Sequence, residues 1–390
     1  MTAPLRIALL LDPMQVLLDK PWSLHVRWED HAQALLHELA GRGHEVRRFG
    51  LPRVLLARGN EVGTEDGELS GSPELRSSLA AFEPDVIVAY ESRSSAALRG
   101  ARVARRLGAA FVVVEPAWIE ESGPARWFSR VGRRLWGGTI RSSARAVVAL
   151  DPLARERAIR SGFPAERITV VRYGIDLAQF RPGLTTSLVA RHRVGGRVVL
   201  YVGRLLADRG LDVLIRAFGR TVGQRADWSL VIAGDGPERA NLLQAATRVG
   251  IADRLFLFGA PKPAELPGLL GAATLFAFPA VGLDGTARQV MRAMACGLPG
   301  LISDLPRLAG TVEHEATGLV VPPGDEAAWA EALRRATSSP ETRKRWGVRA
   351  RQVAEERFGW NVVGERLETL FRDAALQAAL VRQQRERRPA

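Results

Sequence analysis

Short apolar runs alternate along the whole chain with longer segments in which apolar residues recur at helical spacing. In segment 29–42, for example, Ala32, Leu35, Leu36 and Leu39 recur at this spacing, which predicts an amphipathic helix. Uninterrupted apolar runs are typical of parallel strands that are buried on both faces. The alternation therefore predicts an α/β fold built around parallel sheets. The expected strands cover residues 6–11, 45–49, 85–89, 110–115, 146–150 and 168–171, and then 198–202, 230–233, 255–258, 275–278, 300–303 and 319–321.

The expected strands form two consecutive series, separated by segment 182–196, which we interpret as an interdomain linker. Two such series predict two Rossmann-like domains that face each other across a cleft, with helices at the C-terminus. Ligands of such sheets bind beyond the carboxyl ends of the strands. Segment 59–73, rich in Gly, Glu and Ser, is predicted to be an exposed loop. The expected divisions are an N-terminal domain over 1–182, a C-terminal domain over 183–372, and a basic helix or tail over 373–390.

The composition is that of an ordinary globular protein, with 390 residues, 46% apolar and 25% charged. Cys296 is the single cysteine, so a disulfide framework within one chain is excluded. The apolar run 5–11 is too short for a signal-peptide core or a membrane span. We therefore expect a cytoplasmic location.

A net charge of +13 and a pI near 11.1 indicate a polyanionic partner: nucleic acid, an anionic membrane or a phosphate-bearing substrate. No helix-turn-helix, zinc-knuckle or aromatic RNA-platform pattern accompanies the charge, which argues against nucleic acid. In segment 124–136 arginines interleave with aromatic residues. That segment could lie on an anionic membrane as a peripheral contact, or Trp127, Val131 and Leu135 could simply face the core.

Candidate chemistry follows the expected strand 198–202. Gly203 allows the backbone to approach a ligand closely, and Arg204 and Arg209 lie five residues apart at the start of a helix. Two guanidinium groups at a sheet edge can hold a diphosphate by charge-assisted hydrogen bonds. The alternative is a pair of surface arginines at a helix start.

A second strand-to-helix turn contains Gly234, Gly236 and Pro237. A third segment reads Asp284-Gly-Thr-Ala-Arg-Gln-Val-Met-Arg292 and continues into Ala-Met-Ala-Cys-Gly-Leu-Pro299. It resembles the nucleotide-sugar motif of the retaining GT-B glycosyltransferases of family 4, which has two Glu residues eight apart before Ala-Met-Ala-x-Gly-x-Pro. Further landmarks extend the resemblance over about residues 5–375: Arg42-Gly-His-Glu-Val46, Pro84-Asp-Val86, Val170-Val-Arg-Tyr-Gly-Ile-Asp176, Thr317-Gly-Leu-Val-Val-Pro-Pro-Gly-Asp325 and Arg357-Phe-Gly-Trp360.

The resemblance implies transfer of a sugar from a nucleotide diphosphate sugar to a hydroxyl of a glycan, lipid-linked or small-molecule acceptor. It also implies retention of anomeric configuration, no bound metal and no further cofactor. Arg204 and Arg209 would stabilise the departing diphosphate, and Asp284 would position the sugar with the backbone of residues 285–287. The donor-binding residues that it implies are Gly203, Gly234, Gly236, Pro237, Gly285, Thr286, Ala287, Arg288 and Arg292.

The sequence departs from the family pattern in the same region. Asp284 stands where the first Glu is usual and can still accept hydrogen bonds, whereas Arg292 replaces the second Glu and cannot accept any. Arg292 is therefore expected to pair with a carboxylate or to reach toward phosphate. The family's His near the reaction centre is replaced by Pro116, and Pro306-Arg-Leu-Ala-Gly310 replaces a Gly-Gly loop.

On the acceptor side, Trp22, His25 and Arg27 belong to a loop that could stack on a sugar ring or hydrogen-bond an acceptor. The same Trp rings could instead pack against the domain edge. Glu115, Glu120 and Glu121 lie close to the position of the missing His and could take over its contact.

A non-catalytic GT-B scaffold or regulatory partner with a degenerate donor site is the alternative function. The departures at Arg292, Pro116 and 306–310 favour it, whereas the presence of Arg204, Arg209 and Asp284 favours the enzyme. An anion-binding module would rest on charge alone.

Overall fold

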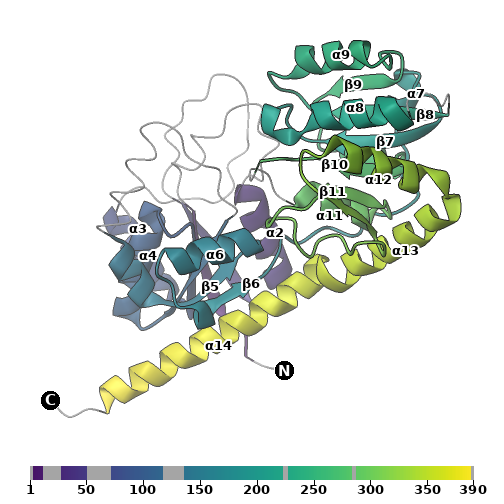
Figure 1. Ribbon diagram of the computed structural model, residues 1–390. Helices are drawn as coiled ribbons and strands as arrows, with labels where there is room; N and C mark the ends of the chain where they lie inside the picture. Colours follow the sequence, from purple (N-terminus) through teal and green to yellow (C-terminus); the bar gives the residue numbers. More distant parts are fainter. Residues whose placement is uncertain are drawn as a thin grey trace, which may run out of the picture. The chain divides into compact units, whose positions relative to one another are not determined.

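The computed structural model describes residues 3–11, 28–50, 72–116, 136–222, 227–282 and 287–387, and it contains two compact units (Figure 1). Unit 1 comprises the described residues up to Arg172 together with those from Val363 onward. Unit 2 comprises Tyr173–Val362. Among the described residues, the chain thus passes into unit 2 once and returns once, at points that precede the divisions expected after residues 182 and 372.

Unit 1 is built on a six-stranded parallel sheet with the strand order β2-β1-β3-β4-β5-β6. Residues of β3 and β4 are buried throughout, as expected for strands covered on both faces. The elements of this unit are β1 (Arg6–Leu11), α2 (Trp28–Gly41), β2 (Glu45–Gly50), α3 (Ser72–Phe82), β3 (Val86–Tyr90), α4 (Ser95–Leu107), β4 (Ala110–Glu115), β5 (Ala144–Ala149), α6 (Pro152–Arg160) and β6 (Ile168–Val170).

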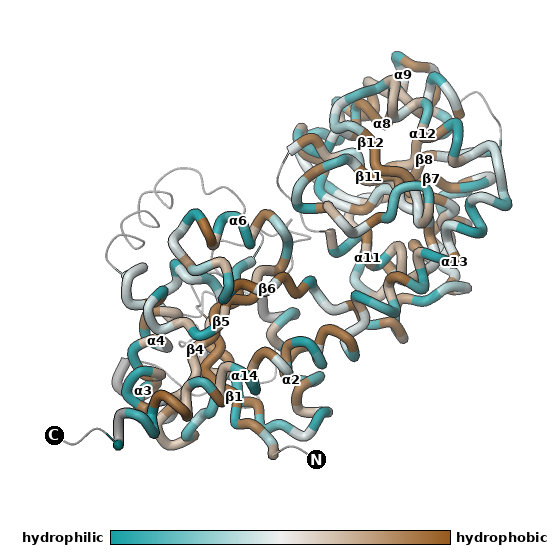
Figure 2. The backbone as a smooth tube through the Cα atoms, turned by 60° about the horizontal axis from the view of Figure 1, so that its bottom comes forward, coloured by the Kyte–Doolittle hydropathy of each residue, from teal (hydrophilic) through white to brown (hydrophobic). Residues whose placement is uncertain are grey.

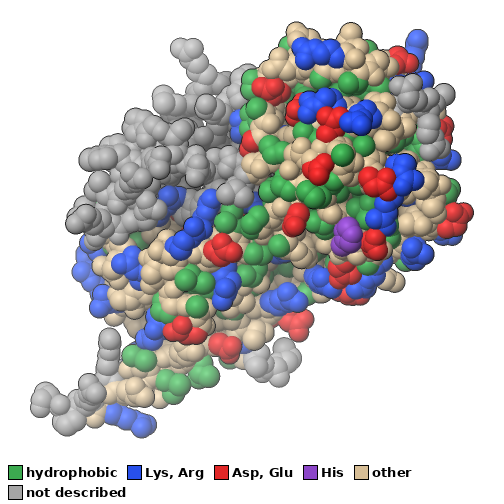
Figure 3. All heavy atoms as spheres, in the orientation of Figure 1, with side chains coloured by type: hydrophobic (Ala, Val, Ile, Leu, Met, Phe, Trp, Pro, Cys, Tyr) green, Lys and Arg blue, Asp and Glu red, His purple; other side chains and the backbone are tan. Residues whose placement is uncertain are grey.

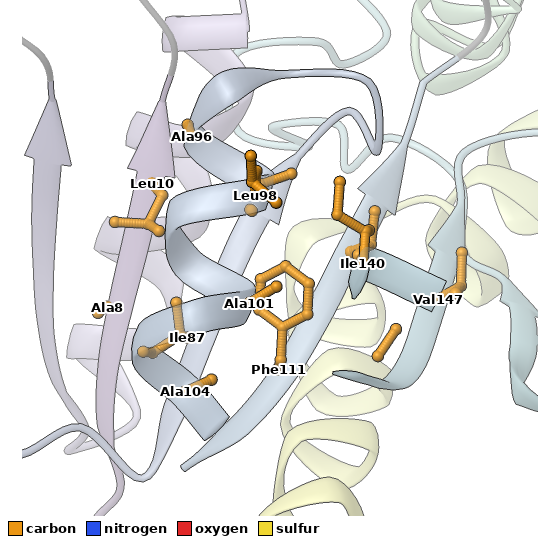
Figure 4. Packing of buried hydrophobic residues seen from close by; sticks show 14 of the residues in the cluster. Ala8, Leu10, Ile87, Ala96, Leu98, Ala101, Ala104, Phe111, Ile140 and Val147 are labelled. Carbon is orange, nitrogen blue, oxygen red and sulfur yellow. The ribbon is translucent and has the colours of Figure 1, made fainter. Parts of the chain in front are cut away.

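The core of unit 1 lies where α4 crosses the sheet (Figure 4). Gly100 of α4 makes this approach possible, because a β-carbon there would lie 2.6 Å from Leu10 and 3.0 Å from Phe111. The side chain of Ser94 caps the helix by accepting from the Ala97 N–H at 3.0 Å. The helix start is therefore fixed directly above the end of β3.

Unit 2 is built on a second six-stranded parallel sheet with the order β12-β11-β10-β7-β8-β9. From β7 the chain adds β8 and β9 on one side of the sheet, and from β10 it adds β11 and β12 on the other side. This order is the doubly wound Rossmann arrangement. The elements are α7 (Ser187–Arg191), β7 (Arg197–Val202), α8 (Leu211–Thr221), β8 (Trp228–Ala233), α9 (Arg239–Arg248), β9 (Leu255–Gly259), α10 (Leu266–Gly271), β10 (Leu275–Phe278), α11 (Arg288–Ala295), β11 (Gly300–Ser303), β12 (Gly318–Val321), α12 (Glu326–Ser338) and α13 (Pro340–Arg357).

All the expected strands are present, with ends that differ from the prediction by at most two residues, and the α/β fold class is confirmed. Figure 2 shows that the strands of both sheets follow hydrophobic parts of the chain. The hydrophobic pattern of the sequence therefore indicated them. Segment 182–196, interpreted from the sequence as an interdomain linker, lies within unit 2 and contains the helix α7. The loop expected at 59–73 lies mostly outside the described residues.

The last helix, α14 (Trp360–Glu386), begins in unit 2 and continues in unit 1. The basic helix or tail expected from residue 373 is the end of this longer helix, which runs through that position without a break. Glu368 of α14 lies 3.3 Å from both Arg42 and His44, and Arg372 donates to the carbonyl of Ala3 at 2.7 Å. These contacts fix the C-terminal helix on the first strands of the chain.

In the part of the chain that the structure describes, no helix is long and apolar enough to cross a membrane. On the face shown in Figure 3, Lys and Arg side chains lie at several places with Asp and Glu between them. The positive charge on that face is therefore distributed.

Candidate functional site

The strand order of unit 2 places a topological switch point between β7 and β10. The chain leaves β7 toward one side of the sheet and leaves β10 toward the other, so their following segments diverge. Such divergence opens a crevice at the carboxyl ends of the two strands, where ligands of this architecture bind. Among the described residues, the candidate site is therefore formed by residues 203–210 after β7 and by residues 279–282 and 287 after β10.

These two segments contact each other through their backbones. The N–H groups of Val281 and Gly282 donate to the carbonyl of Asp208 at 2.9 and 3.0 Å. Gly210 adopts a left-handed conformation with φ 61°, and a β-carbon there would lie 2.1 Å from the carbonyl oxygen of Pro279. A side chain at Gly210 would separate the two segments, which explains the glycine that follows Arg209.

The turn after β8 joins the same edge. Gly203 N–H donates to the carbonyl of Ala233 at 3.0 Å. A β-carbon on Gly234 would lie 1.7 Å from the carbonyl oxygen of Gly203, and one on Gly236 would lie 2.3 Å from that of Leu205. The structure thus brings together Gly203, Gly234 and Gly236, which the sequence predicted as backbone that approaches a ligand. Pro237 is exposed beside them.

The two candidate arginines differ in their surroundings. Arg204 is half-buried, and its carbonyl accepts from the Tyr201 hydroxyl at 3.0 Å. Arg209 is only 4% exposed, and its Nε lies 3.6 Å from Oδ1 of Asp208. A buried guanidinium needs an anion nearby, and Asp208 supplies one within the same turn. Neither Asp208 nor Tyr201 was predicted from the sequence as part of this edge, although Asp208 directly precedes Arg209 and Tyr201 lies three residues before Arg204.

The helix α11 follows the second segment of the site. Asp284, Gly285 and Thr286 lie outside the described residues, whereas Ala287 is buried and Arg288 is half-buried. Arg292, which was expected to pair with a carboxylate or to reach toward phosphate, makes two described contacts. Its guanidinium lies 4.8 Å from the centroid of the Phe180 ring, and Nη1 donates to Oε1 of Gln289 at 3.4 Å.

Residues after β11 complete the edge. The segment 306–310, which departs from the family's Gly-Gly loop, contains Arg307, a side chain only 3% exposed. Burial of a third arginine at this edge was not predicted from the sequence. A signal was present, because Arg307 is the one charged residue within an otherwise uncharged segment, 305–312.

In unit 1, Glu115 is the last residue of β4 and is 3% exposed. Its Oε1 accepts from the Ser92 N–H at 3.2 Å. Burial raises the pKa of Glu115 to about 7, against the opposing effects of Ser92 and the Arg93 charge. The other acceptor-side candidates, Trp22, His25, Arg27 and Glu120, lie outside the described residues, as do Glu121 and nearly all of segment 124–136.

Further polar residues surround the carboxyl edge of the unit 1 sheet. Glu91 follows β3 with φ 66° and lies 3.5 Å from Arg93. Asp151 follows β5 and caps α6 by accepting from the Ala154 N–H at 2.7 Å. The buried His31 has its Nδ1 2.9 Å from the Tyr90 hydroxyl. This contact was not predicted from the sequence, because the two residues are far apart in the chain.

Among the residues that the structure describes, no group of three or more His, Cys, Asp or Glu side chains is arranged to hold a metal ion. The expected independence from a metal stays a prediction.

Two doubly wound units, one of them with glycine turns and arginines at its switch point, define a GT-B protein. The model of the family described as glycosyl transferases group 1 matches residues 189–353, and that of the glycosyl transferase 4-like domain matches residues 28–174. The chain belongs to the GT-B glycosyltransferases of family 4.

Characterised relatives resemble parts of the chain. An alpha-D-kanosaminyltransferase from Streptomyces kanamyceticus is 27% identical over 242 residues, which are 61% of this chain and 62% of that protein. A D-inositol 3-phosphate glycosyltransferase from Acidothermus cellulolyticus is 31% identical over 271 residues, 65% of this chain and 59% of the relative. The matched regions thus span about half to three fifths of the relatives' length.

Solved structures share the fold over nearly the whole chain. Sucrose-phosphate synthase from Thermosynechococcus elongatus has a TM-score of 0.69 at 20% identity, covering 96% of this chain and 99% of that one. The Anabaena protein HepE, solved in complex with UDP and glucose, has a TM-score of 0.67 at 20% identity, with 94% and 99% covered. At this identity the likeness establishes the fold.

Proposed function

We propose that the protein transfers a sugar from a nucleotide diphosphate sugar to a hydroxyl of a glycan, lipid-linked or small-molecule acceptor. The proposal includes retention of anomeric configuration and no requirement for a metal. One observation carries it: the turns after β7, β8 and β10 contact one another at the switch point of unit 2, and the turn after β7 holds Arg204 and Arg209.

The chemistry at this edge would stabilise a leaving diphosphate. As the bond between the anomeric carbon and the diphosphate oxygen breaks, negative charge develops on the phosphates. Arg204 and Arg209 supply fixed cationic donors for that charge. The glycines at 203, 234 and 236 allow the backbone to approach the nucleotide, and Arg288 lies at the start of α11.

The remaining donor contacts are assigned to residues 284–287. Asp284 would accept hydrogen bonds from sugar hydroxyls, and backbone N–H groups at Gly285, Thr286 and Ala287 would donate to the sugar. The acceptor hydroxyl bonds to the anomeric carbon as the bond to the diphosphate oxygen breaks, and its proton passes to the departing diphosphate. Glu115 at the end of β4 is the described acceptor-side candidate, with Trp22, His25, Arg27 and Glu120 as the others.

One structural neighbour points to a class of donor. The Anabaena protein HepE was solved in complex with UDP and in complex with UDP-glucose. Uridine diphosphate sugars are therefore the first donors to test.

The test is incubation with a panel of nucleotide sugars and acceptors, with nucleoside diphosphate release and thermal shift measured together. The expected result is stabilisation by at least one donor and release that is lost in Arg204→Ala. Arg220→Ala is the matched control, because that side chain is 64% exposed on α8 and pairs with Glu326. The proposal would be contradicted if no donor in the panel binds or is turned over.

The alternative is a non-catalytic GT-B scaffold. The observation that favours it is the contact of Arg292 with Phe180, which places a cation on an aromatic ring at a position where the family usually has a carboxylate. Stabilisation by a partner protein without stabilisation by any nucleotide sugar is the result expected for this alternative.

A further inference from the structure

Arg292 lies at a junction between α11 and the segment by which the chain enters unit 2. Residues 173–182 form this segment, which we call the incoming segment. We propose that Arg292 and Arg351 are positioning residues, which hold α11, and thereby the start of this helix at the sheet edge, in place on the incoming segment. The inference rests on the proposed function, and it gives Arg292 a role within the chain in place of a direct donor contact.

The helix α11 is short, so the structures at its far end determine its direction. It has eight residues and starts directly after the second segment of the candidate site. Its C-terminal end closes with Gly297 at φ 77° and a hydrogen bond from Leu298 N–H to the Ala293 carbonyl at 3.0 Å. Any shift of this end tilts the start of the helix at the sheet edge.

Arg351 of α13 holds that far end. Its Nη1 donates to the carbonyl of Ala295 at 2.7 Å and to the carbonyl of Phe180 at 2.8 Å. Ala295 lies in the last turn, where carbonyl groups have no partner within the helix, so the charged donor satisfies an otherwise open acceptor. The same guanidinium thus joins α11 to the incoming segment.

Arg292 makes the second connection between these elements. Its guanidinium lies 4.8 Å from the centroid of the Phe180 ring, which is 3% exposed. A guanidinium over an aromatic face is attracted by the ring quadrupole, and the attraction strengthens where water is excluded. Phe180 is therefore held twice, through its ring by Arg292 and through its carbonyl by Arg351.

The incoming segment is in turn joined to the chain where it leaves unit 2. Ile175 N–H donates to the carbonyl of Phe358 at 2.7 Å, and Trp360 N–H donates to the carbonyl of Ile175 at 3.2 Å. A β-carbon on Gly174 would lie 2.2 Å from the Trp360 ring, so the two segments are in close contact. Helix α11 is thereby connected to both segments through which unit 2 continues into unit 1.

The experiment compares Arg292→Met, Phe180→Leu and the double variant with wild type. Arg197→Met is the matched control, because it removes a guanidinium 5.7 Å from the Trp228 ring at the amino end of β7. Three quantities are measured: hydrogen exchange of residues 174–182 and of α11, kcat and KM for nucleoside diphosphate release, and the Kd of uridine diphosphate.

Positioning predicts that both single variants speed exchange in the incoming segment and lower kcat by about tenfold. The Kd of uridine diphosphate should change by less than about twofold, and the double variant should be no worse than the poorer single variant. Arg292→Lys, which keeps a cation over the ring, should recover part of kcat. The control should match wild type.

Two results would overturn the inference. One is a Kd of uridine diphosphate weakened by about tenfold or more in Arg292→Met and unchanged in Phe180→Leu, which would make Arg292 a donor contact. The other is unchanged exchange in both single variants. If wild type turns over no donor, the proposed function fails, whereas the exchange measurement still decides whether Arg292 and Phe180 hold the incoming segment.

Discussion

The carboxyl edges of the two sheets have the same architecture but differ in the side chains and turns that line them. In unit 2, the turns that follow the strands consist of close-packed glycines together with Arg204 and Arg209. In unit 1, the residues at the corresponding edge include the carboxyl groups of Glu91, Glu115 and Asp151. A cationic edge lined by backbone suits phosphates, whereas buried carboxyl groups suit hydroxyl or ammonium groups.

The difference shows where the functional information of such a chain resides. Both sheets are parallel, six-stranded and buried, so the layers alone would not assign the two units different ligands. The assignment of a phosphate-bearing donor to unit 2 and a hydroxyl-bearing acceptor to unit 1 depends on a few side chains at the strand ends. Variants at those side chains can therefore break or sharpen the comparison.

The largest effect is expected at Arg209. Replacement by Ala removes a donor for the leaving diphosphate and leaves Asp208 without this cation, so kcat should fall by about 100- to 1000-fold. Arg209→Lys keeps the charge and should stay within about tenfold of wild type. Steady-state kinetics of nucleoside diphosphate release measure both. Equal losses of kcat in the two variants would mean that the unit 2 edge requires the geometry of the guanidinium group and not only its charge.

Glu115→Gln tests the opposite edge through its pH dependence. Burial raises the pKa of the Glu115 carboxyl from its ordinary value of 4.5 to about 7. Between these pH values the folded protein therefore binds more protons than the unfolded chain. The stability contributed by Glu115 is therefore present at low pH and is lost as the pH rises to about 7. The variant should match wild type near pH 4 and exceed it near pH 8 by up to about 3 kcal/mol.

Urea unfolding at several pH values measures this difference. The Gln side chain can still accept from the Ser92 N–H, so wild type and variant both keep this hydrogen bond. If Glu115 also contacts the acceptor, the variant gains stability and loses acceptor affinity together. A stability difference that does not vary with pH would show that the carboxyl is not held in an environment that opposes its charge.

Gly234→Ala tests the packing of the unit 2 edge. The added carbon would lie 1.7 Å from the Gly203 carbonyl oxygen, so the turns after β7 and β8 must separate, at a cost of about 1–3 kcal/mol. Gly195→Ala is the control, because nothing lies within 4 Å of a β-carbon there. Thermal unfolding should distinguish the two variants, and equal melting temperatures would contradict the close contact.

The smallest effect is expected on the surface, away from either edge. Arg220 lies 3.0 Å from Glu326 with 64% of its side chain exposed. Solvent screens such a pair, so Arg220→Ala should cost about 0.5 kcal/mol or less, and high salt should remove the difference. Activity should not change. A larger loss of stability, or any loss of activity, would mean that this distant surface charge contributes to the edge chemistry.

The sheets could be predicted from the sequence because parallel strands buried on both faces leave uninterrupted apolar runs. The run at 110–115, for instance, is buried at every position and was expected with its observed bounds. The glycines and arginines after β7 and β8 were predicted as site residues for a similar reason, since strand-to-helix turns have recognisable residues. Their gathering at one edge follows from the strand order.

The contacts that could not be predicted are those between residues distant in the chain. Phe180 and Arg292 meet because α11 ends on the incoming segment, and no local pattern in either segment indicates the other. The contact of Glu368 with Arg42 and His44 is of the same kind. Helix α7 escaped prediction for a different reason, because five residues are too few to show helical periodicity.

The single departure and single return of the chain have a consequence for how such proteins can be recombined. Among the described residues, unit 2 is one uninterrupted stretch, 173–362, whose two ends meet at the contact of Ile175 with Gly359. Unit 1, in contrast, depends on both flanking portions of the chain. Unit 2 could therefore be exchanged as a single cassette, whereas loss of the last helix would damage the fold of unit 1.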